Sequence, residues 1–257
     1  MTFQQKLDSA ILKNNSLLCI NLDPDEKTSD LFEFNKKIID ETHGLVCCYK
    51  PNSAFYEAQG APGIEALKRT IDYIHRVTSG LPVILDAKRG DIGNTNRGYV
   101  RYAFEYLNAD GIVVNPYMGG EALSLFFDQK EKGIVVMCRT SNPGAGELQN
   151  LISDGKPLFQ HVAEKVATAW NKNGNLMVVV GATYPEELQK VREIVGDMTI
   201  LVPGIGAQGG DLEKTLKVGL NSKKAGLIIA VGRSIIYSEN VKKETEKLRN
   251  QINLLKS

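Results

Sequence analysis

The sequence predicts a single-domain α/β protein, a (β/α)8 barrel of the TIM type that spans residues 1–257. Its length of 257 residues is close to the roughly 250 residues that such a barrel needs. Short apolar runs alternate with helical patterns from one end to the other, and no linker-like stretch divides them. Several runs are apolar throughout, which is typical of parallel strands covered on both faces. One closed barrel therefore fits better than two domains.

Eight apolar runs are the expected strands of this barrel. Each is short, and each is followed by a polar or glycine-containing stretch that ends it. In chain order they are Leu17–Leu22, Leu45–Tyr49, Val83–Leu85, Gly111–Val114, Gly133–Cys138, Leu176–Val180, Thr199–Val202 and Gly226–Ala230.

Helical segments fill the connections between these strands. Residues 60–63 mark one helix entry. Pro185 marks another, because proline fits the first helical turn and the two glutamates that follow it favour the positive end of the helix dipole. Residues 240–256 are charged with mixed sign, so we expect a solvated final helix. The clearest helical segments are Ile64–Val77, Thr95–Leu107, Leu158–Asn171 and Pro185–Ile194.

One long segment, residues 138–157, interrupts this alternation after the fifth strand. It is rich in Gly, Asn, Ser and Pro, and it carries Arg139, Thr140 and Ser141 directly after the strand. A loop of this length in a compact domain is often a lid over an active site. A tolerated surface insertion is the alternative, and we favour the lid.

The charge and cysteine content exclude several classes of partner. The chain has 31 basic and 30 acidic residues without a basic block, so we expect neither nucleic acid nor a membrane surface as a partner. No signal peptide or membrane-spanning run is visible, which favours a cytoplasmic protein. The four cysteines lie in apolar runs without metal-ligand spacing, and we expect them to be small buried side chains.

Charged residues gather where the first three strands end. Asp23 follows the first strand, Lys50 the second, and Asp86 and Lys88 the third. Active sites of such barrels lie at the carboxyl ends of the strands. Two residues that are two positions apart point the same way in an extended chain, so Asp86 and Lys88 should both face the barrel mouth near Lys50. Asp91, three residues further on, belongs either to this cluster or to another site. A structural ion-pair network is the alternative, and the number of charges favours function.

Glycine-rich turns follow the last two strands. Pro203 leads into Gly-Ile-Gly-Ala-Gln-Gly-Gly, which includes Gln208, and the eighth strand ends at Gly232 and Arg233. Barrels often bind phosphate with these two loops, where bare glycine backbone exposes N–H groups. An arginine adds a charge-assisted contact. Ordinary turns also need glycine, but the pair of turns with Arg233 predicts a phosphate site.

The three histidines are not expected to act in the site. His43, His75 and His161 fall in helical or loop segments away from the strand ends, and we expect them to be solvated or packed. No metal-ligand cluster is visible, so the sequence predicts no bound metal.

Taken together, these residues resemble the orotidine 5′-phosphate decarboxylases of the longer bacterial type. The resemblance covers most of the chain. It rests on the stretches "NLDP", "YKPN", "LDAKRGDIGNTN", "VPGIGAQGGD" and "VGRSI". It implies a homodimeric barrel that converts orotidine 5′-monophosphate (OMP) to UMP without cofactor or metal, in the last step of pyrimidine nucleotide synthesis.

The resemblance also implies roles for single residues. The charged tetrad would be Lys50, Asp86, Lys88 and Asp91, with Lys88 protonating C6 of the pyrimidine. Asp91 and Thr95 would reach into the site of the partner subunit. The implied substrate contacts are Asp23 to the ribose, Ser141 to the pyrimidine, Gln208, Gly232 and Arg233 to the phosphate, and also Ile92 and Pro203.

Two other functions remain open at this point. One is a related barrel enzyme acting on a sugar phosphate, either a metal-dependent decarboxylase or an aldolase that forms a lysine Schiff base. Metal dependence and borohydride trapping would distinguish it. The other is a protein that binds UMP without catalysis. It would gain little from Asp86 facing an anionic ligand, since like charges repel.

Overall fold

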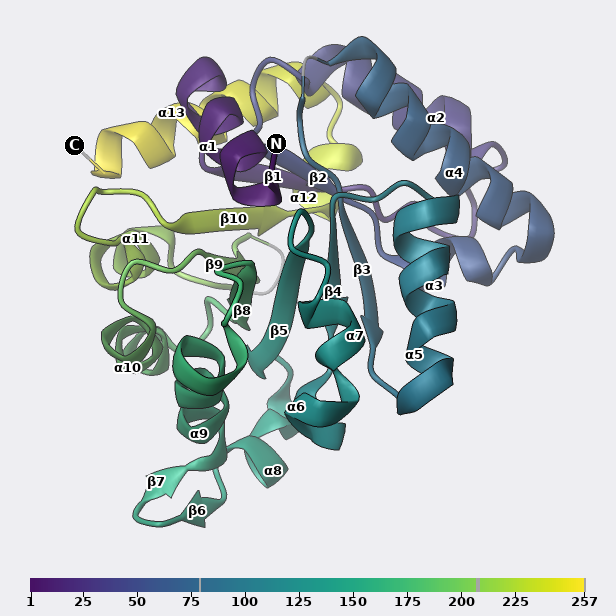
Figure 1. Ribbon diagram of the computed structural model, residues 1–257. Coiled ribbons are helices and arrows are strands. Elements are labelled where there is room, and N and C mark those ends of the chain that lie inside the picture. Colours follow the sequence, from purple (N-terminus) through teal and green to yellow (C-terminus); the bar gives the residue numbers. More distant parts are fainter. Residues whose placement is uncertain (79, 207–208, 257) are drawn as a thin grey trace.

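The computed structural model describes residues 1–78, 80–206 and 209–256, and its centre is a parallel β-barrel (Figure 1). The strand order is β2-β1-β10-β9-β8-β5-β4-β3. All paired strands of the barrel run parallel. Bridges from Tyr49 to Val83 and from Asn52 to Asp86 join β2 to β3 and complete the ring. The barrel strands are β1 (Leu18–Asn21), β2 (Cys48–Lys50), β3 (Ile84–Arg89), β4 (Gly111–Val114), β5 (Gly133–Arg139), β8 (Leu176–Val180), β9 (Ile200–Pro203) and β10 (Leu227–Val231).

The predicted barrel and its eight strands are therefore confirmed. Several bounds differ by one residue, and two differ by more. β2 begins only at Cys48, and β3 continues to Arg89 instead of ending at Leu85. The register of β3 against β4 shifts between Leu85 and Arg89, so the added length is irregular strand.

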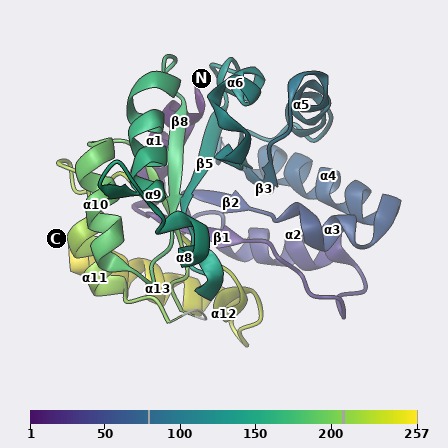
Figure 2. The ribbon, with the colours of Figure 1, turned by 90° about the horizontal axis from the view of Figure 1, so that it is seen from below.

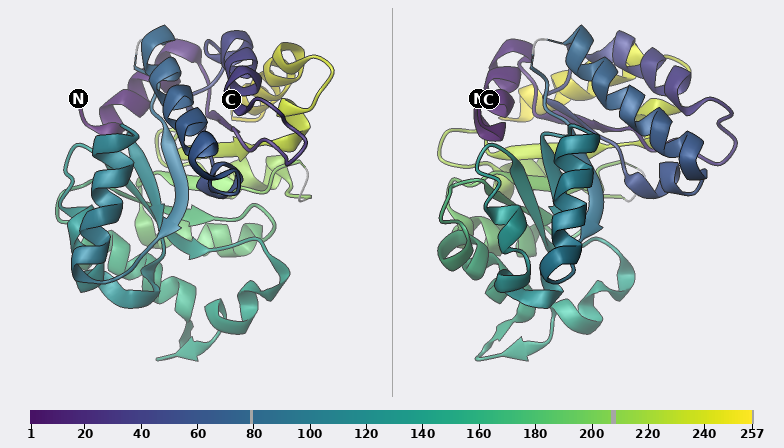
Figure 3. Two further views of the ribbon diagram at one scale, coloured as in Figure 1. Left: turned by 90° about the vertical axis from the view of Figure 1, so that its right-hand side faces the viewer. Right: turned by 45° about the vertical axis from the view of Figure 1, so that its right-hand side comes forward.

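Helices surround the barrel on its outside (Figures 1 and 3). The predicted helices are present, but the segments expected at 95–107 and 158–171 end in π-helical turns at Arg101–Tyr106 and Val166–Trp170. The α-helices are α1 (Phe3–Asn14), α2 (Leu31–Thr42), α3 (Ser53–Glu57), α4 (Gly60–Val77), α5 (Gly93–Val100), α6 (Gly119–Ala122), α7 (Ser124–Phe127), α8 (Gly146–Gln149), α9 (Leu158–Lys165), α10 (Pro185–Val195), α11 (Leu212–Gly219), α12 (Arg233–Ile236) and α13 (Val241–Lys256).

Helix α1 closes the amino-terminal end of the barrel. Its Phe3 and Leu7 join the buried cluster formed by inward-facing strand residues. A Cβ atom at Gly133 would lie 2.6 Å from the Phe3 ring, so only glycine leaves room for this plug. Figure 1 shows α1 at the top, while β5 points downward, away from it. The opposite, carboxyl-terminal end is therefore the one free to form a site.

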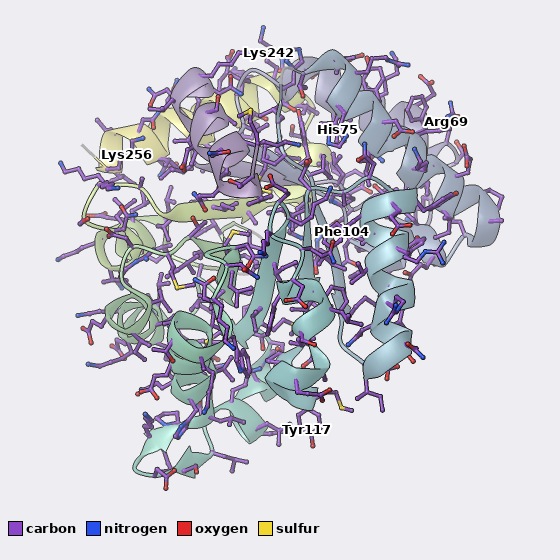
Figure 4. The ribbon with its side chains drawn as sticks, viewed as in Figure 1. Arg69, His75, Phe104, Tyr117, Lys242 and Lys256 are labelled. Carbon is purple, nitrogen blue, oxygen red and sulfur yellow. The ribbon has the colours of Figure 1, made fainter. Side chains whose placement is uncertain are left out.

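A buried carboxylate also stabilises this closed end. Asp110 accepts hydrogen bonds from Lys6 Nζ at 2.6 Å and from the Val83 N–H at 2.9 Å, and it lies 2.8 Å from His75 Nε2. Burial alone would raise the pKa of Asp110, but His75 and Lys6 lower it to about 2. His75 lies near the top of Figure 4, far from Tyr117 at the bottom. The network joins α1, α4 and the starts of two strands.

The long segment after β5 lies at the other end. It contains a 3₁₀ turn at Pro143–Ala145, α8, and a hairpin of β6 (Ile152–Ser153) and β7 (Lys156–Pro157). These elements project beyond the strand tips in Figures 1 and 3, and α8 lies in front of the strands when the molecule is viewed from below (Figure 2). The segment thus lies beside the barrel mouth, as a lid must. Within the described residues, no helix has the length and apolar character to cross a membrane.

Candidate active site

A cavity of about 940 Å³ opens at the carboxyl ends of the strands. Inward-facing apolar residues such as Val113, Val179 and Leu201 form part of its wall. The remainder is polar and comes from the strand ends and the loops that follow them. The predicted site residues that line it are Asp23, Lys50, Asp86, Lys88, Ser141, Pro203, Gly232 and Arg233.

Three charged side chains form a continuous chain in this cavity. Lys50 Nζ lies 2.7 Å from one carboxylate oxygen of Asp86, and Lys88 Nζ lies 2.6 Å from the other. Lys50 is only 3% exposed, whereas the Lys88 side chain is 47% exposed. Each oxygen of Asp86 is thus paired with one ammonium group. The more exposed of these two groups, that of Lys88, is the one that a ligand in the cavity can reach.

The backbone brings Lys88 into the cavity in an unexpected way. The prediction that the chain stays extended from Asp86 to Lys88 is wrong, because Lys88 adopts a left-handed conformation with φ of 47°. This conformation is uncommon for a residue with a side chain. It coincides with the register shift at the end of β3. Both side chains nevertheless line the cavity, as predicted.

Burial and charge set the ionisation of the cluster. Burial raises the pKa of Asp23 above its usual value, although Lys50 and the Asn52 N–H oppose this. Burial alone would raise the pKa of Asp86 too, but the charges of Lys50 and Lys88 lower it. Burial also disfavours charge on Lys50, yet Asp86 and Asp23 raise the pKa of its ammonium group. Lys50 and Asp86 therefore remain an ion pair at neutral pH.

Three predicted site residues lie outside the cavity. Asp91, Ile92 and Thr95 do not line it, and Ile92 is 56% exposed. The Asp91 carboxylate accepts a hydrogen bond from the Ile92 N–H at 2.7 Å. The side chain of Asn96 accepts from the Asp91 N–H at 3.0 Å and donates to the Ala122 carbonyl at 2.6 Å. The turn is therefore well fixed, and it leaves Ile92 and Thr95 exposed.

The glycine-rich loops border the opposite wall of the cavity. Gly204 and Gly206 both have positive φ, which a side chain would disfavour. Arg233 is exposed at the start of α12, and Gly232 precedes it. Gln208, which the sequence assigns to the phosphate, lies outside the described residues.

Arg139, which directly follows the fifth expected strand, does not belong to the mouth. It does not line the cavity. Its guanidinium is buried against Glu187, with Nε 2.6 Å from a carboxylate oxygen, and it stacks over the Tyr184 ring. Of the three residues that follow the fifth strand, Thr140 and Ser141 do reach the cavity.

The structure adds cavity residues that the sequence did not single out. Asn52 fixes Asp23, because its N–H donates to the Asp23 carboxylate at 3.0 Å. The Tyr237 hydroxyl accepts from the Asp25 N–H at 2.6 Å and so links two loops across the mouth. Asn21 of β1 also lines the cavity. Asn21 and Asn52 each lie two residues from a charged residue already noted, Asp23 and Lys50, whereas Tyr237 lies beyond α12 and has no such sequence signal.

The histidines lie away from the cavity, as expected. His75 belongs to the Asp110 network, His43 follows α2, and His161 contacts the Ser153 carbonyl. All four cysteines are buried and free, which confirms their assignment as packed side chains. Across the described ranges, no group of three or more His, Cys, Asp or Glu side chains is arranged to hold a metal ion.

A parallel (β/α)8 barrel with a charged, substrate-sized cavity at the strand ends defines a barrel enzyme. The sequence profile described as "Orotidine 5′-phosphate decarboxylase / HUMPS family" matches residues 16–248. The chain belongs to this family, which confirms the resemblance noted in its motifs.

Individual relatives agree with this assignment. The chain is 46% identical to orotidine 5′-phosphate decarboxylase of Cellvibrio japonicus, and the alignment covers 100% of both chains. The structure of Leishmania donovani OMP decarboxylase is similar, with a TM-score of 0.93, 38% identity, and coverage of 100% of this chain and 99% of that one. Leishmania donovani UMP synthase matches with a TM-score of 0.95 and 40% identity. There the similarity covers 100% of this chain but 57% of the longer one.

Proposed function

We propose that this enzyme decarboxylates OMP to UMP, the last step of pyrimidine nucleotide synthesis, and that Lys88 protonates C6 of the pyrimidine. Family membership and full-length similarity to named decarboxylases support the reaction. The observation that carries the mechanism is the Lys50–Asp86–Lys88 chain, whose reachable end is the Lys88 ammonium group.

The chemistry of the reaction explains why such a chain is useful. Loss of CO₂ from C6 leaves a carbanion in the plane of the ring, without an adjacent carbonyl that delocalises it. An enzyme accelerates this step by stabilising charge that exists near the transition state and not in the substrate. A fixed Lys88 ammonium does this, and it then delivers a proton to C6.

The other charged groups prepare Lys88 for this task. Asp86 holds the ammonium at 2.6 Å and would face the departing carboxylate of the substrate. Its charge would disfavour the bound substrate more than the transition state, from which the negative carboxylate is leaving. Lys50 holds the second oxygen of Asp86 and keeps that carboxylate ionised.

The rest of the substrate would be bound around this centre. We assign Asp23 to the ribose and Ser141 to the pyrimidine. Gln208, Gly232 and Arg233 would bind the phosphate, and Pro203 would also contact the substrate. The phosphate is remote from C6, so its binding energy can serve to close the lid and organise the site.

We further propose that the enzyme acts as a homodimer with shared sites. Asp91 and Thr95 would cross into the cavity of the partner subunit, where Asp91 would complete the charged tetrad. Ile92, on the same turn, would contact the substrate there. Two observations support this. These residues do not line their own cavity, and Ile92 is an apolar side chain that is largely exposed in the single chain.

The remaining features of the proposal concern the whole chain. One barrel domain, residues 1–257, would carry the entire activity in the cytoplasm. It would act on its small-molecule substrate without cofactor, metal, nucleic acid or membrane.

The activity is tested by following the loss of OMP absorbance with purified protein and with Lys88→Ala. We expect the substitution to lower turnover by on the order of 10³-fold, since it removes both the stabilising charge and the proton donor. Lys6→Ala is the matched control, because Lys6 also pairs with a buried aspartate but lies at the closed end. Undiminished turnover by Lys88→Ala would contradict the role of Lys88, and no turnover by the wild-type protein would contradict the function.

A further inference from the structure

The lid is folded back onto the strand end from which it starts. Gln149, at the end of α8, accepts a hydrogen bond from the Thr140 N–H at 2.9 Å and donates one to the Thr140 hydroxyl at 2.9 Å. The same hydroxyl donates to the Asn142 side chain at 2.7 Å. One glutamine side chain thus determines the path of residues 140–142, which include Ser141.

Arg139 anchors this arrangement from behind. Its guanidinium donates to the Thr140 carbonyl at 2.8 Å and to the Gln149 side chain at 3.3 Å, while Glu187 of α10 holds its other face. Arg139 is 2% exposed. A buried, ion-paired guanidinium loses little conformational freedom when it makes further bonds. The lid is therefore fixed to the barrel wall as well as to its own helix.

Gly181, directly after β8, packs closely against Ser141 because it has no side chain. A Cβ atom at Gly181 would lie 2.7 Å from Ser141 Cβ and 3.0 Å from Ser141 Cα. Gly181 does not have a positive φ, and the three heavy atoms nearest to such a Cβ all belong to Ser141, so this contact opposes alanine here. The Gly181 N–H also donates to the Arg139 carbonyl at 2.9 Å. Gly181 is thus the wall against which Ser141 rests.

We propose that Gln149 and Gly181 are positioning residues that set Ser141 for contact with the pyrimidine before the ligand binds. Gln149 does so by its two bonds to Thr140, and Gly181 by the absence of a side chain. This inference deepens the proposed function and rests on it. A preorganised contact strengthens binding because its ordering cost is met before the ligand arrives.

Replacing either residue should therefore reduce the affinity for ligands that carry the pyrimidine base, and not for ligands that lack it. Gln149→Ala and Gly181→Ala should each weaken UMP binding roughly tenfold, the effect of one ordinary hydrogen bond. Neither should change the affinity for ribose 5-phosphate, which lacks the base, by more than about twofold. Gln149→Glu keeps the acceptor for the Thr140 N–H but loses the bond to the Thr140 hydroxyl, so we expect an intermediate effect. A destabilised but otherwise unaltered protein would lose binding sites for both ligands without such selectivity.

The experiment measures both affinities calorimetrically for the full-length variants, together with amide hydrogen exchange of residues 140–142. Gln189→Ala is the matched control, because that exposed glutamine bonds Glu193 within its own helix, α10. We expect faster exchange at Thr140 in Gln149→Ala and unchanged exchange in the control. The proposal would be overturned if folded Gln149→Ala bound UMP and ribose 5-phosphate with equally reduced affinity, or if neither affinity changed. Unchanged exchange at residues 140–142 would also overturn it. Gln149→Ala decides the question if Gly181→Ala does not fold.

Failure of the proposed function would be recognised independently of this proposal, because the wild-type protein would then neither bind UMP nor consume OMP. The exchange rates of residues 140–142 still test the role of Gln149 in that case, since they need no ligand.

Discussion

Asp86 and Asp110 are both buried carboxylates held between two basic side chains, and they lie at opposite ends of the same barrel. Asp110 bonds Lys6, His75 and a backbone N–H, which come from three separate parts of the chain. Asp86 bonds Lys50 and Lys88, and Lys88 is only two residues away and opens onto the cavity.

The difference shows how similar ion pairs serve different ends. Every partner of Asp110 ties one element of the closed end to another, so its interactions stabilise the fold. Asp86 instead holds the ammonium group of Lys88 at the wall of a cavity. Lys88 itself adopts a left-handed backbone conformation that is uncommon for lysine. Strain and exposed charge at this position do not favour folding, and such features are typical of functional sites.

Of the two aspartates, the one at the mouth should give the larger effect when it is replaced. Asp86→Asn should lower OMP turnover by on the order of 10²- to 10³-fold, because a neutral amide no longer fixes both ammonium groups. The folded structure should persist, since Lys50 keeps Asp23 as a neighbouring carboxylate. Turnover and thermal unfolding measured on the same sample check this. If Asp86→Asn lost stability but kept its activity per folded molecule, Asp86 would have the structural role that is assigned here to Asp110.

The corresponding change at the closed end should affect stability alone. The lowered pKa of Asp110, about 2 against an ordinary 3.8, corresponds to about 2 kcal/mol of stabilisation at neutral pH. Asp110→Asn should lower the free energy of unfolding by about this amount and leave kcat of the folded enzyme unchanged. Urea denaturation with parallel assays measures both quantities. A fall in kcat without a loss of stability would remove the contrast with Asp86.

The smallest expected effect is the pH dependence of the stabilisation that Asp110 provides. A carboxyl group whose pKa is lowered by folding stabilises the protein above its unfolded pKa, and this stabilisation disappears as the pH falls toward its folded pKa. The stability difference between wild type and Asp110→Asn should therefore be constant near pH 7 and shrink between about pH 4 and pH 2. Denaturation curves across this range test it. A difference that grows on acidification would show that another group is responsible.

Much of the molecule could be predicted from its sequence, because the relevant signals are local. Apolar runs marked all eight strands, and the barrel rule that active sites follow the strands led to Asp23, Lys50, Asp86 and Lys88. The long irregular segment after the fifth strand was recognisable from its composition.

The remaining features depend on contacts that a linear pattern does not contain. The direction of Arg139 is set by Glu187, 48 residues further on, and the Asp110 network joins residues up to 104 positions apart. Tyr237 reaches the mouth from beyond α12, where no strand end points to it. The left-handed backbone at Lys88 depends on the register shift between β3 and β4, which apolar periodicity does not reveal.

The stretch from Asp86 to Thr95 is proposed to serve two active sites, and subunit mixing tests this most directly. Inactive Lys88→Ala and Asp91→Ala proteins are combined in equal amounts, and OMP turnover is followed while mass spectrometry records subunit exchange. Each hybrid dimer would contain one site with both residues intact. We therefore predict recovery to roughly a quarter of wild-type activity, since half of the randomly paired dimers are hybrids and half of their sites are intact. No recovery despite demonstrated exchange would contradict a shared site.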